Sequence, residues 1–170
     1  FLSGYAGEAL LLTDLEELTA ALLAHARPAL DGVRPVGIHD LLWEIERDGL
    51  EQLLCNWLVF EKERAVGGLL PVCFERPFGK FGEGEIHPEL RIQAGQHCFV
   101  FRGRIDRIDL SGDGKHARVI DYKTGSLPDS MHKRERPLLM AGEKLQVAVY
   151  PGVLSSLDGL QEVESIEGEY

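Results

Sequence analysis

The stretch Val119-Ile-Asp-Tyr-Lys-Thr-Gly125 determines how the rest of the sequence is interpreted. Two apolar β-branched residues lead into it and a glycine ends it, which predicts a buried strand that stops at Gly125. Because side chains on a strand alternate between faces, Asp121 and Lys123 share one face and Tyr122 lies on the other. Charged groups on a buried strand are costly unless they pair with each other or bind a ligand. Taken alone, the stretch predicts either an ion pair at a strand end or part of an active site.

A second strand is expected just before it. Residues 99–110 are separated from Val119 by the turn Ser111-Gly-Asp-Gly-Lys115, which predicts a hairpin. Pairing of the two strands would bring Asp106 close to Asp121. Two carboxylates at adjacent strand ends can hold Mg²⁺ or Mn²⁺, because such hard cations prefer oxygen ligands. A bound cation of this kind can activate water and stabilise charge on a phosphate.

Three motifs occur in order: Gly103-Arg-Ile-Asp-Arg107, Ile120-Asp-Tyr-Lys-Thr-Gly125 and Leu145-Gln-Val-Ala-Val-Tyr150. From about Glu75 to Tyr150 the sequence resembles the PD-(D/E)XK nuclease superfamily, and more narrowly the nuclease domain of RecB- and AddB-type helicase–nucleases. The resemblance implies an α/β fold with a restriction-endonuclease-like mixed β-sheet flanked by helices. It also implies a Mg²⁺-dependent deoxyribonuclease, specifically an exonuclease of DNA repair and recombination.

The resemblance assigns roles to the motif residues. Asp106 is the first metal ligand, because the family pattern is Gly-x-x-Asp. Asp121 is the second, and the backbone carbonyl of Tyr122 is a further ligand. Lys123 orients or helps to deprotonate the attacking water and offsets negative charge on the phosphate. Asp109 lies three residues after Asp106, hence on the opposite face, and we expect it to be exposed or to pair with its neighbouring arginine.

The third motif and the first strand supply the remaining candidates. Gln146 and Tyr150 are i, i+4 neighbours on one helix face, and in the resembled family they support the lysine and contact the DNA strand. Glu75 matches a first-strand glutamate near the metal, although a solvent-facing residue on an edge strand explains it equally well. RecB-type nucleases also carry a histidine ligand on an N-terminal helix. His39 is only superficially similar, so we expect that histidine before Phe1.

The charge distribution predicts where DNA would bind. The chain carries a net charge of −10, but residues 102–136 hold 9 Lys and Arg against 6 Asp and Glu. A positive segment around the motifs has the sign expected for a phosphate substrate, although chance clustering is not excluded. Residues 126–142 form either a solvated loop or a loop that contacts a single strand. The candidate DNA-contacting residues are Arg104, Arg107, Lys133, Arg134 and Arg136.

We expect residues 1–170 to form a single nuclease-like domain, with a helical part at 1–68 and a sheet with the motifs at 69–170. A helix after residue 143 should be kinked or shortened by Pro151. The last segment should add a parallel edge strand through that crossover helix. The expected helices span about 13–29, 39–65 (with a possible restart at 48–51) and 143–155, and the expected strands span 70–79, 86–92, 99–110, 119–125 and 161–170.

The remaining features limit location and partners. No apolar run approaches the ~20 residues that span a bilayer, and three widely spaced cysteines fit a reducing cytoplasm. The first residue is Phe1 rather than Met, so we expect a piece of a larger protein. The expected partners are DNA, delivered as a single strand by a helicase, and other domains or subunits of a helicase–nuclease. The alternative is a catalytically inactive nuclease-fold module with a DNA-binding or structural role.

Overall fold

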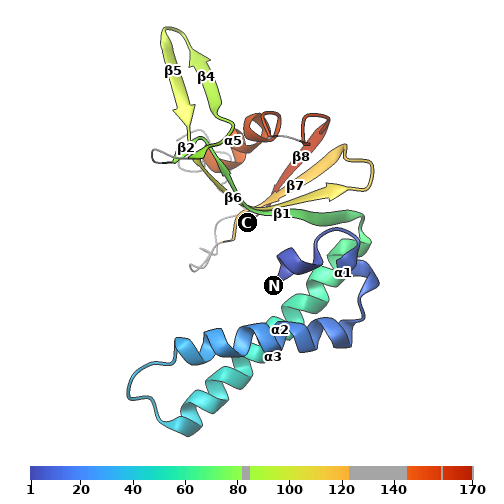
Figure 1. The fold of residues 1–170 in the computed structure, drawn as a ribbon, viewed down its shortest axis with the longest axis vertical. Coiled ribbons are helices and arrows are strands. Elements are labelled where there is room, and N and C mark those ends of the chain that lie inside the picture. The colour runs from blue at the N-terminus through green and yellow to red at the C-terminus, as the bar shows by residue number, and fades with distance from the viewer. Residues whose placement is uncertain (82–84, 123–144, 158, 170) are drawn as a thin grey trace, which may run out of the picture. The chain divides into compact units, whose positions relative to one another are not determined.

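The computed structural model describes residues 1–81, 85–122, 145–157 and 159–169. The chain divides into two compact units, a helical unit Phe1–Leu70 and a sheet unit Pro71–Tyr170, and each is described by itself (Figure 1). The boundary falls within two residues of the one expected from the sequence. Within the described part of the chain, no helix is long and apolar enough to cross a membrane.

The helical unit consists of two long helices preceded by two short ones. The elements are η1 (Leu2–Tyr5), α1 (Ala9–Leu12), α2 (Leu15–Gly32) and α3 (Asp40–Val66). Leu18 and Leu22 on α2, and Trp43 and Leu58 on α3, are buried, whereas Leu53 on α3 is 64% exposed. The α3 helix runs without a break through Gly49, so the suggested restart at residues 48–51 is wrong.

Polar contacts join these helices. Arg27 on α2 donates two hydrogen bonds to the Glu51 carboxylate on α3, at 3.0 and 2.9 Å. This guanidinium holds the pKa of Glu51 below its ordinary value. The Lys62 ammonium group of α3 donates to the backbone carbonyls of Leu11 and Thr13, beside α1. Paired charges and satisfied carbonyls thus complement the apolar contacts between the helices.

The sheet unit contains a four-stranded mixed sheet in the order β1-β6-β7-β8 (Figure 1). β6 and β7 are antiparallel, whereas β7 and β8 are parallel and are connected through α5. The expected parallel edge strand is therefore confirmed, as is the α/β, restriction-endonuclease-like class with a mixed sheet and helices. The elements are β1 (Leu69–Phe78), β2 (Lys80–Phe81), β3 (Glu85–Ile86), β4 (Leu90–Ala94), β5 (His97–Phe101), β6 (Gly103–Ser111), β7 (His116–Ile120), α5 (Leu145–Leu154) and β8 (Ser165–Glu169).

The core of the sheet unit lies between the sheet and α5. Ile108 on β6 pairs with Val119 on β7, and both are buried in the same cluster as Val149 and Val153 of α5. The helix continues through Pro151 to Leu154, so the proline does not shorten it at that point. The apolar face of the β6–β7 pair thus fixes the crossover helix over the sheet.

A tight turn sets the register of the β6–β7 hairpin. The Ser111 hydroxyl donates to an Asp113 carboxylate oxygen at 2.5 Å, and the Lys115 amide donates to the same oxygen at 3.0 Å. These bonds hold the pKa of Asp113 below its ordinary value. A turn closed by its own side chains fixes the register of the strands that follow.

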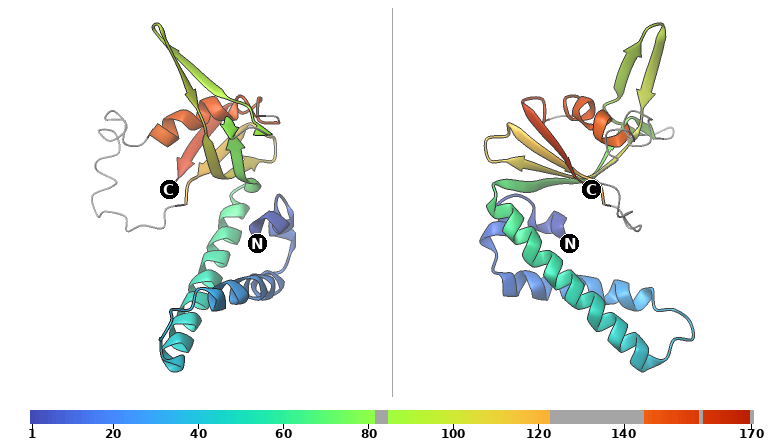
Figure 2. Two further views of the ribbon diagram at one scale, coloured as in Figure 1. Left: turned by 60° about the vertical axis from the view of Figure 1, so that its left-hand side comes forward. Right: turned by 180° about the vertical axis from the view of Figure 1, so that it is seen from behind.

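A second hairpin, β4–β5, extends from the sheet unit as a two-stranded arm (Figure 2). The sequence predicted one strand over residues 99–110, but Arg102 separates β5 from β6. The expected strand 86–92 is likewise divided between β3 and β4. Leu90 and Phe101, at the base of the arm, pack against the core cluster.

Gly79 joins β1 to β2 where only glycine fits. Its φ is +82°, and a Cβ there would lie 2.8 Å from the Phe101 carbonyl oxygen and from the Arg102 Cβ. We expect Gly79→Ala to lower the free energy of unfolding by about 2 kcal/mol or more, since the left-handed backbone alone costs roughly 1–2 kcal/mol. Urea denaturation measures this loss in the free energy of unfolding. Gly112→Ala has open space around it and should change stability by less than about 0.5 kcal/mol; equal effects would contradict the steric explanation.

Candidate nuclease site

The β6–β7 register brings the two candidate metal ligands together. Arg107 pairs with Ile120 at the end of the register, and Asp106 and Asp121 are the next residues along the two segments. The backbone amide of Tyr122 donates to Asp106 Oδ2 at 2.8 Å. The Asp106 carboxylate therefore lies against the peptide bond between Asp121 and Tyr122, as expected.

Asp121 directly follows β7, an interior strand of the sheet. Its backbone amide donates to the Glu169 carbonyl on β8 at 3.0 Å, and the residue is 6% exposed. A carboxylate this deeply buried is costly unless polar or cationic groups compensate it. The Glu169 carbonyl on β8 and the Asp106 carboxylate on β6 thus both accept hydrogen bonds from the backbone at Asp121 and Tyr122.

The donor set fits a hard divalent cation. Both carboxylates offer oxygen atoms, which Mg²⁺ and Mn²⁺ prefer, and Mg²⁺ binds with few protein ligands because it retains several waters. Among the described residues, no group of three or more His, Cys, Asp or Glu gathers. Asp106 and Asp121 would therefore hold a cation as two carboxylates, with backbone oxygen, water or substrate at its other positions.

Glu75 does not join these aspartates. It lies on β1 with φ at +49°, an uncommon conformation for a residue other than glycine. Its carboxylate is 64% exposed and pairs with Arg104 at 3.3 Å. Of the two explanations that the sequence left open, the structure favours the solvent-facing residue, because the carboxylate is exposed and pairs with Arg104.

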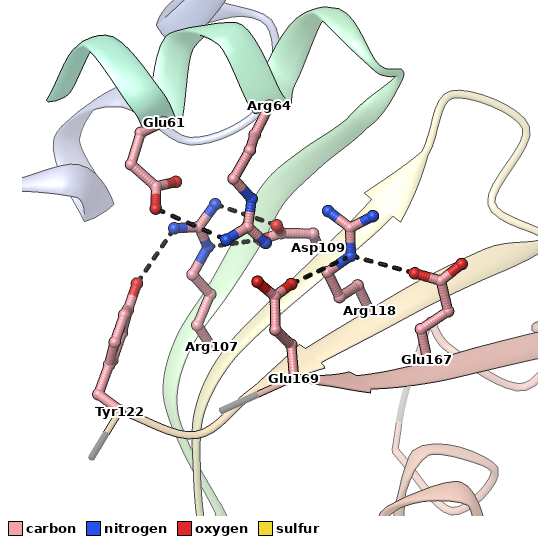
Figure 3. A network of polar contacts seen from close by, with 8 residues as sticks. All are labelled: Glu61, Arg64, Arg107, Asp109, Arg118, Tyr122, Glu167 and Glu169. Carbon is pink, nitrogen blue, oxygen red and sulfur yellow. Dashed lines mark hydrogen bonds and ion pairs between the residues drawn. The ribbon is translucent and has the colours of Figure 1, made fainter. Parts of the chain in front are cut away.

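A buried ion pair lies beside the site (Figure 3). Arg107 donates to both oxygens of Asp109, at 2.6 and 3.0 Å, and both residues are 1% exposed. Arg107 also donates to the Tyr122 hydroxyl at 3.1 Å. The predicted pairing of Asp109 with its neighbouring arginine is confirmed. The predicted contact of Arg107 with DNA is corrected, because the guanidinium is buried and committed to Asp109 and Tyr122.

Exposed ion pairs follow the same sheet. Arg118 on β7 contacts Glu167 at 3.2 Å and Glu169 at 3.6 Å, both on β8 (Figure 3). Such cross-strand pairs support the β7–β8 register with small energies. In the helical unit, Glu61 and Arg64 lie 4.0 Å apart, one turn from each other on α3.

A pocket of about 200 Å³ collects two of the predicted residues, Arg104 and Tyr150. Tyr150 is 3% exposed and lies on α5, while Arg104 lies on β6, two residues before Asp106. Gly103, the first residue of the first motif, also lines the pocket, whereas sequence analysis assigned no functional role to Phe78, Phe101, Arg102 or Val149. The available signal was the two phenylalanines followed by two arginines between Phe99 and Arg104. The full lining is Phe78, Phe101, Arg102, Gly103, Arg104, Val149 and Tyr150.

Other predicted residues lie partly or wholly outside the described structure. Gln146 is on α5, one turn before Tyr150, but its side chain is outside the described part. His39 caps the start of α3, where its Nδ1 accepts a hydrogen bond from the Leu41 amide at 3.2 Å. His39 therefore has a structural role as a helix cap, at the position where the sequence predicted that the helix begins. The residues wholly outside are Lys123, Lys133, Arg134 and Arg136.

Comparison with known proteins points in the same direction as the geometry. The family model of the PD-(D/E)XK nuclease superfamily matches residues 4–168. Relatives include an ATP-dependent helicase/deoxyribonuclease subunit of Bacillus cereus strain AH187, 31% identical over 119 residues, 68% of this chain and 10% of the relative. The Bacillus thuringiensis protein of the same name is 35% identical over 111 residues, 63% of this chain and 9% of that protein. This chain spans about a tenth of the length of these relatives.

We expect Asp109→Ala to lower the free energy of unfolding by about 3–5 kcal/mol, because it leaves the Arg107 charge buried without its carboxylate. Chemical denaturation measures this loss. The control is Glu167→Ala, which removes an exposed partner of Arg118 on the same sheet and should cost about 0–1 kcal/mol. A similar small loss for both variants would contradict a structural role for the Arg107–Asp109 pair.

Proposed function

Because this chain belongs to the PD-(D/E)XK nuclease superfamily, we propose that it is a metal-dependent deoxyribonuclease that hydrolyses phosphodiester bonds. The observation that carries the proposal is the Asp106 carboxylate, held at the Tyr122 amide beside the buried Asp121. Two oxygen ligands at the end of a buried hairpin suit a cation that works on a phosphate.

In this mechanism Asp106, Asp121 and the Tyr122 carbonyl would hold Mg²⁺ or Mn²⁺. The bound cation would supply an activated water and offset charge on the phosphate. Lys123, which follows Tyr122 directly, orients the water and stabilises developing negative charge. Gln146 supports that lysine. The proposed roles other than cation binding therefore fall on two residues. Lys123 is close to Asp121 in sequence, and Gln146 lies on α5.

Arg107 acts in this mechanism as a positioning residue. Its guanidinium is fixed by Asp109 and holds the Tyr122 hydroxyl at 3.1 Å. Because Tyr122 lies between Asp121 and Lys123, restraining its ring restrains the backbone on which both groups are carried. A buried ion pair is well suited to this, since its geometry is fixed by surrounding atoms rather than by solvent.

The biological setting is proposed from the names of the relatives, which are subunits of an ATP-dependent helicase/deoxyribonuclease. We propose exonuclease activity in DNA repair and recombination, on a single strand delivered by a helicase, together with other domains or subunits. The free Cys55, Cys73 and Cys98 accord with a cytoplasmic location. An inactive module is the alternative, but intact Asp106 and Asp121 on paired strands favour catalysis.

We expect Asp106→Asn and Asp121→Asn each to abolish Mg²⁺-dependent cleavage of a fluorescently labelled oligonucleotide while leaving the far-UV circular dichroism unchanged. Losing one carboxylate halves the anionic ligand set. Asp113→Asn is the matched control, because Asp113 is an exposed carboxylate of the same hairpin, and it should cleave at the wild-type rate.

Mn²⁺ titration by calorimetry separates binding from catalysis in the same variants. Wild-type protein and Asp113→Asn should bind with equal affinity, and the two site variants should bind at least tenfold more weakly. Wild-type cleavage by either site variant would overturn the assignment. Undiminished Mn²⁺ binding by both site variants would show that the cation binds at other residues.

We further propose that both units belong to one folding domain, because the family match crosses their boundary at Leu70. Trp43 and Trp57, the only tryptophans, report on the helical unit, and Cys73 is half-buried against the core of the sheet unit. Tryptophan fluorescence and thiol labelling of Cys73 should give the same urea midpoint. Two separate midpoints would show two independently stable domains.

A further inference from the structure

We propose that the β4–β5 arm and the pocket at its base form a binding track for single-stranded DNA, in which bases stack on one face of the arm. The inference rests on the proposed nuclease function and extends it, because it places the substrate strand on named residues leading to the metal site.

One face of the arm carries aromatic rings at regular spacing. The register pairs Leu90 with Phe101 and Ile92 with Phe99, so these side chains share a face with His97. Phe99 is 51% exposed and Ile92 41% exposed. The His97 and Phe99 ring centroids lie 6.5 Å apart. A row of exposed rings two residues apart offers successive platforms on which bases can stack.

The charge of this segment is opposite to that of the chain. Residues 90–105 contain three arginines and a histidine but no Asp or Glu, whereas the whole chain carries −10. Arg91 is paired with Glu89, just outside this range, at 2.8 Å, so the charge available to a ligand lies on Arg102 and Arg104. Arg102 is exposed, and the Arg104 side chain is 59% exposed. Its contact with Glu75 is an exposed ion pair, which is weak and open to exchange for a phosphate. A positive, aromatic segment in an acidic chain is complementary to a nucleic-acid backbone.

The pocket lies at the base of the arm, and its lining residue Arg104 is two positions before Asp106 on β6. Phe101 ends β5 and lines the pocket together with Arg102 and Arg104. Asp106 follows Arg104 by two residues, which is roughly 7 Å along a strand. A strand whose bases stack on the arm and whose phosphates contact these arginines would therefore arrive at the aspartates.

The base of the arm is anchored and its outer part is exposed. Leu90 packs so closely on α5 that a Cβ on Gly152 would lie 2.8 Å from Leu90 Cδ1. Phe101 also packs against the core, whereas Phe99 beyond it does not belong to the core cluster. Exposed apolar groups of this kind indicate a binding surface, and the arginines that accompany them favour nucleic acid over protein.

The first test measures binding of a fluorescein-labelled oligo(dT) to the protein in EDTA, so that no cleavage occurs. We expect Phe99→Ala to raise the Kd at least fivefold, the lower end of the loss for one base–aromatic stack. Val100→Ala is the matched control, because Val100 is 53% exposed on the opposite face of the same strand. It should change the Kd less than twofold. Arg102→Ala should reduce the slope of log K against log salt by about one.

A fluorescent variant distinguishes loss of the aromatic ring from misfolding of Phe99→Ala. Phe99→Trp keeps an aromatic ring, so it should bind oligo(dT) as the wild type does, and its added fluorescence should be quenched when DNA binds. Val100→Trp should show no such quenching. The wild-type signal from Trp43 and Trp57, both in the helical unit, is subtracted as background.

Cleavage assays distinguish failure of the track from failure of the nuclease proposal. A small phosphodiester, thymidine 5′-(p-nitrophenyl phosphate), does not reach the arm, so Phe99→Ala should hydrolyse it at the wild-type rate. If the wild type hydrolyses the small phosphodiester but Phe99→Ala and Val100→Ala bind oligo(dT) equally, the proposed binding track is wrong. The nuclease proposal then stands. If no hydrolysis occurs but Phe99→Ala still weakens binding, the track stands without catalysis. Loss of self-association by Phe99→Ala, with DNA binding unchanged, would make the arm a protein interface and overturn the track.

Discussion

The antiparallel register of β6 and β7 is the constraint on which the candidate site depends. It places Arg107 opposite Ile120, and the two aspartates at the next positions. A shift by one residue would turn every side chain of one strand to the other face. The buried Ile108 and Val119 would then leave the core, so hydrophobic burial itself enforces the register that brings the two carboxylates together. The turn closed by Asp113 adds a local preference for the same pairing.

The charged residues of β6 differ in burial and in how their charge is compensated. Arg107 and Asp109 compensate each other by two short hydrogen bonds and are almost completely buried. Asp106, by contrast, accepts from a backbone amide and is only half-buried. A fully paired charge contributes rigidity, while a partly solvated carboxylate remains able to bind a cation. This difference explains why aspartates three residues apart in one strand have different expected roles.

Ile105 and Ile108 belong to the same core cluster although they are three residues apart. Strict alternation would place them on opposite faces, so the strand is locally irregular between them, where Asp106 lies. Glu75, with its positive φ, is a second irregular position on β1. Alternation therefore predicted the general direction of side chains in these strands but failed where the backbone departs from regular geometry.

The sequence alone determined the hairpin, the pairing of Asp106 with Asp121, the amphipathic helices and the family, because each depends on local periodicity, turn chemistry or ordered motifs. It also allowed the Arg107–Asp109 pair as one of two alternatives. Only the tertiary structure decided that Arg107 is buried rather than available to DNA, that α3 is continuous through Gly49, and that Arg104, Phe101 and Tyr150 line one pocket. These outcomes depend on contacts between residues distant in sequence. Burial and pocket formation are properties of packed surfaces, which no local pattern specifies.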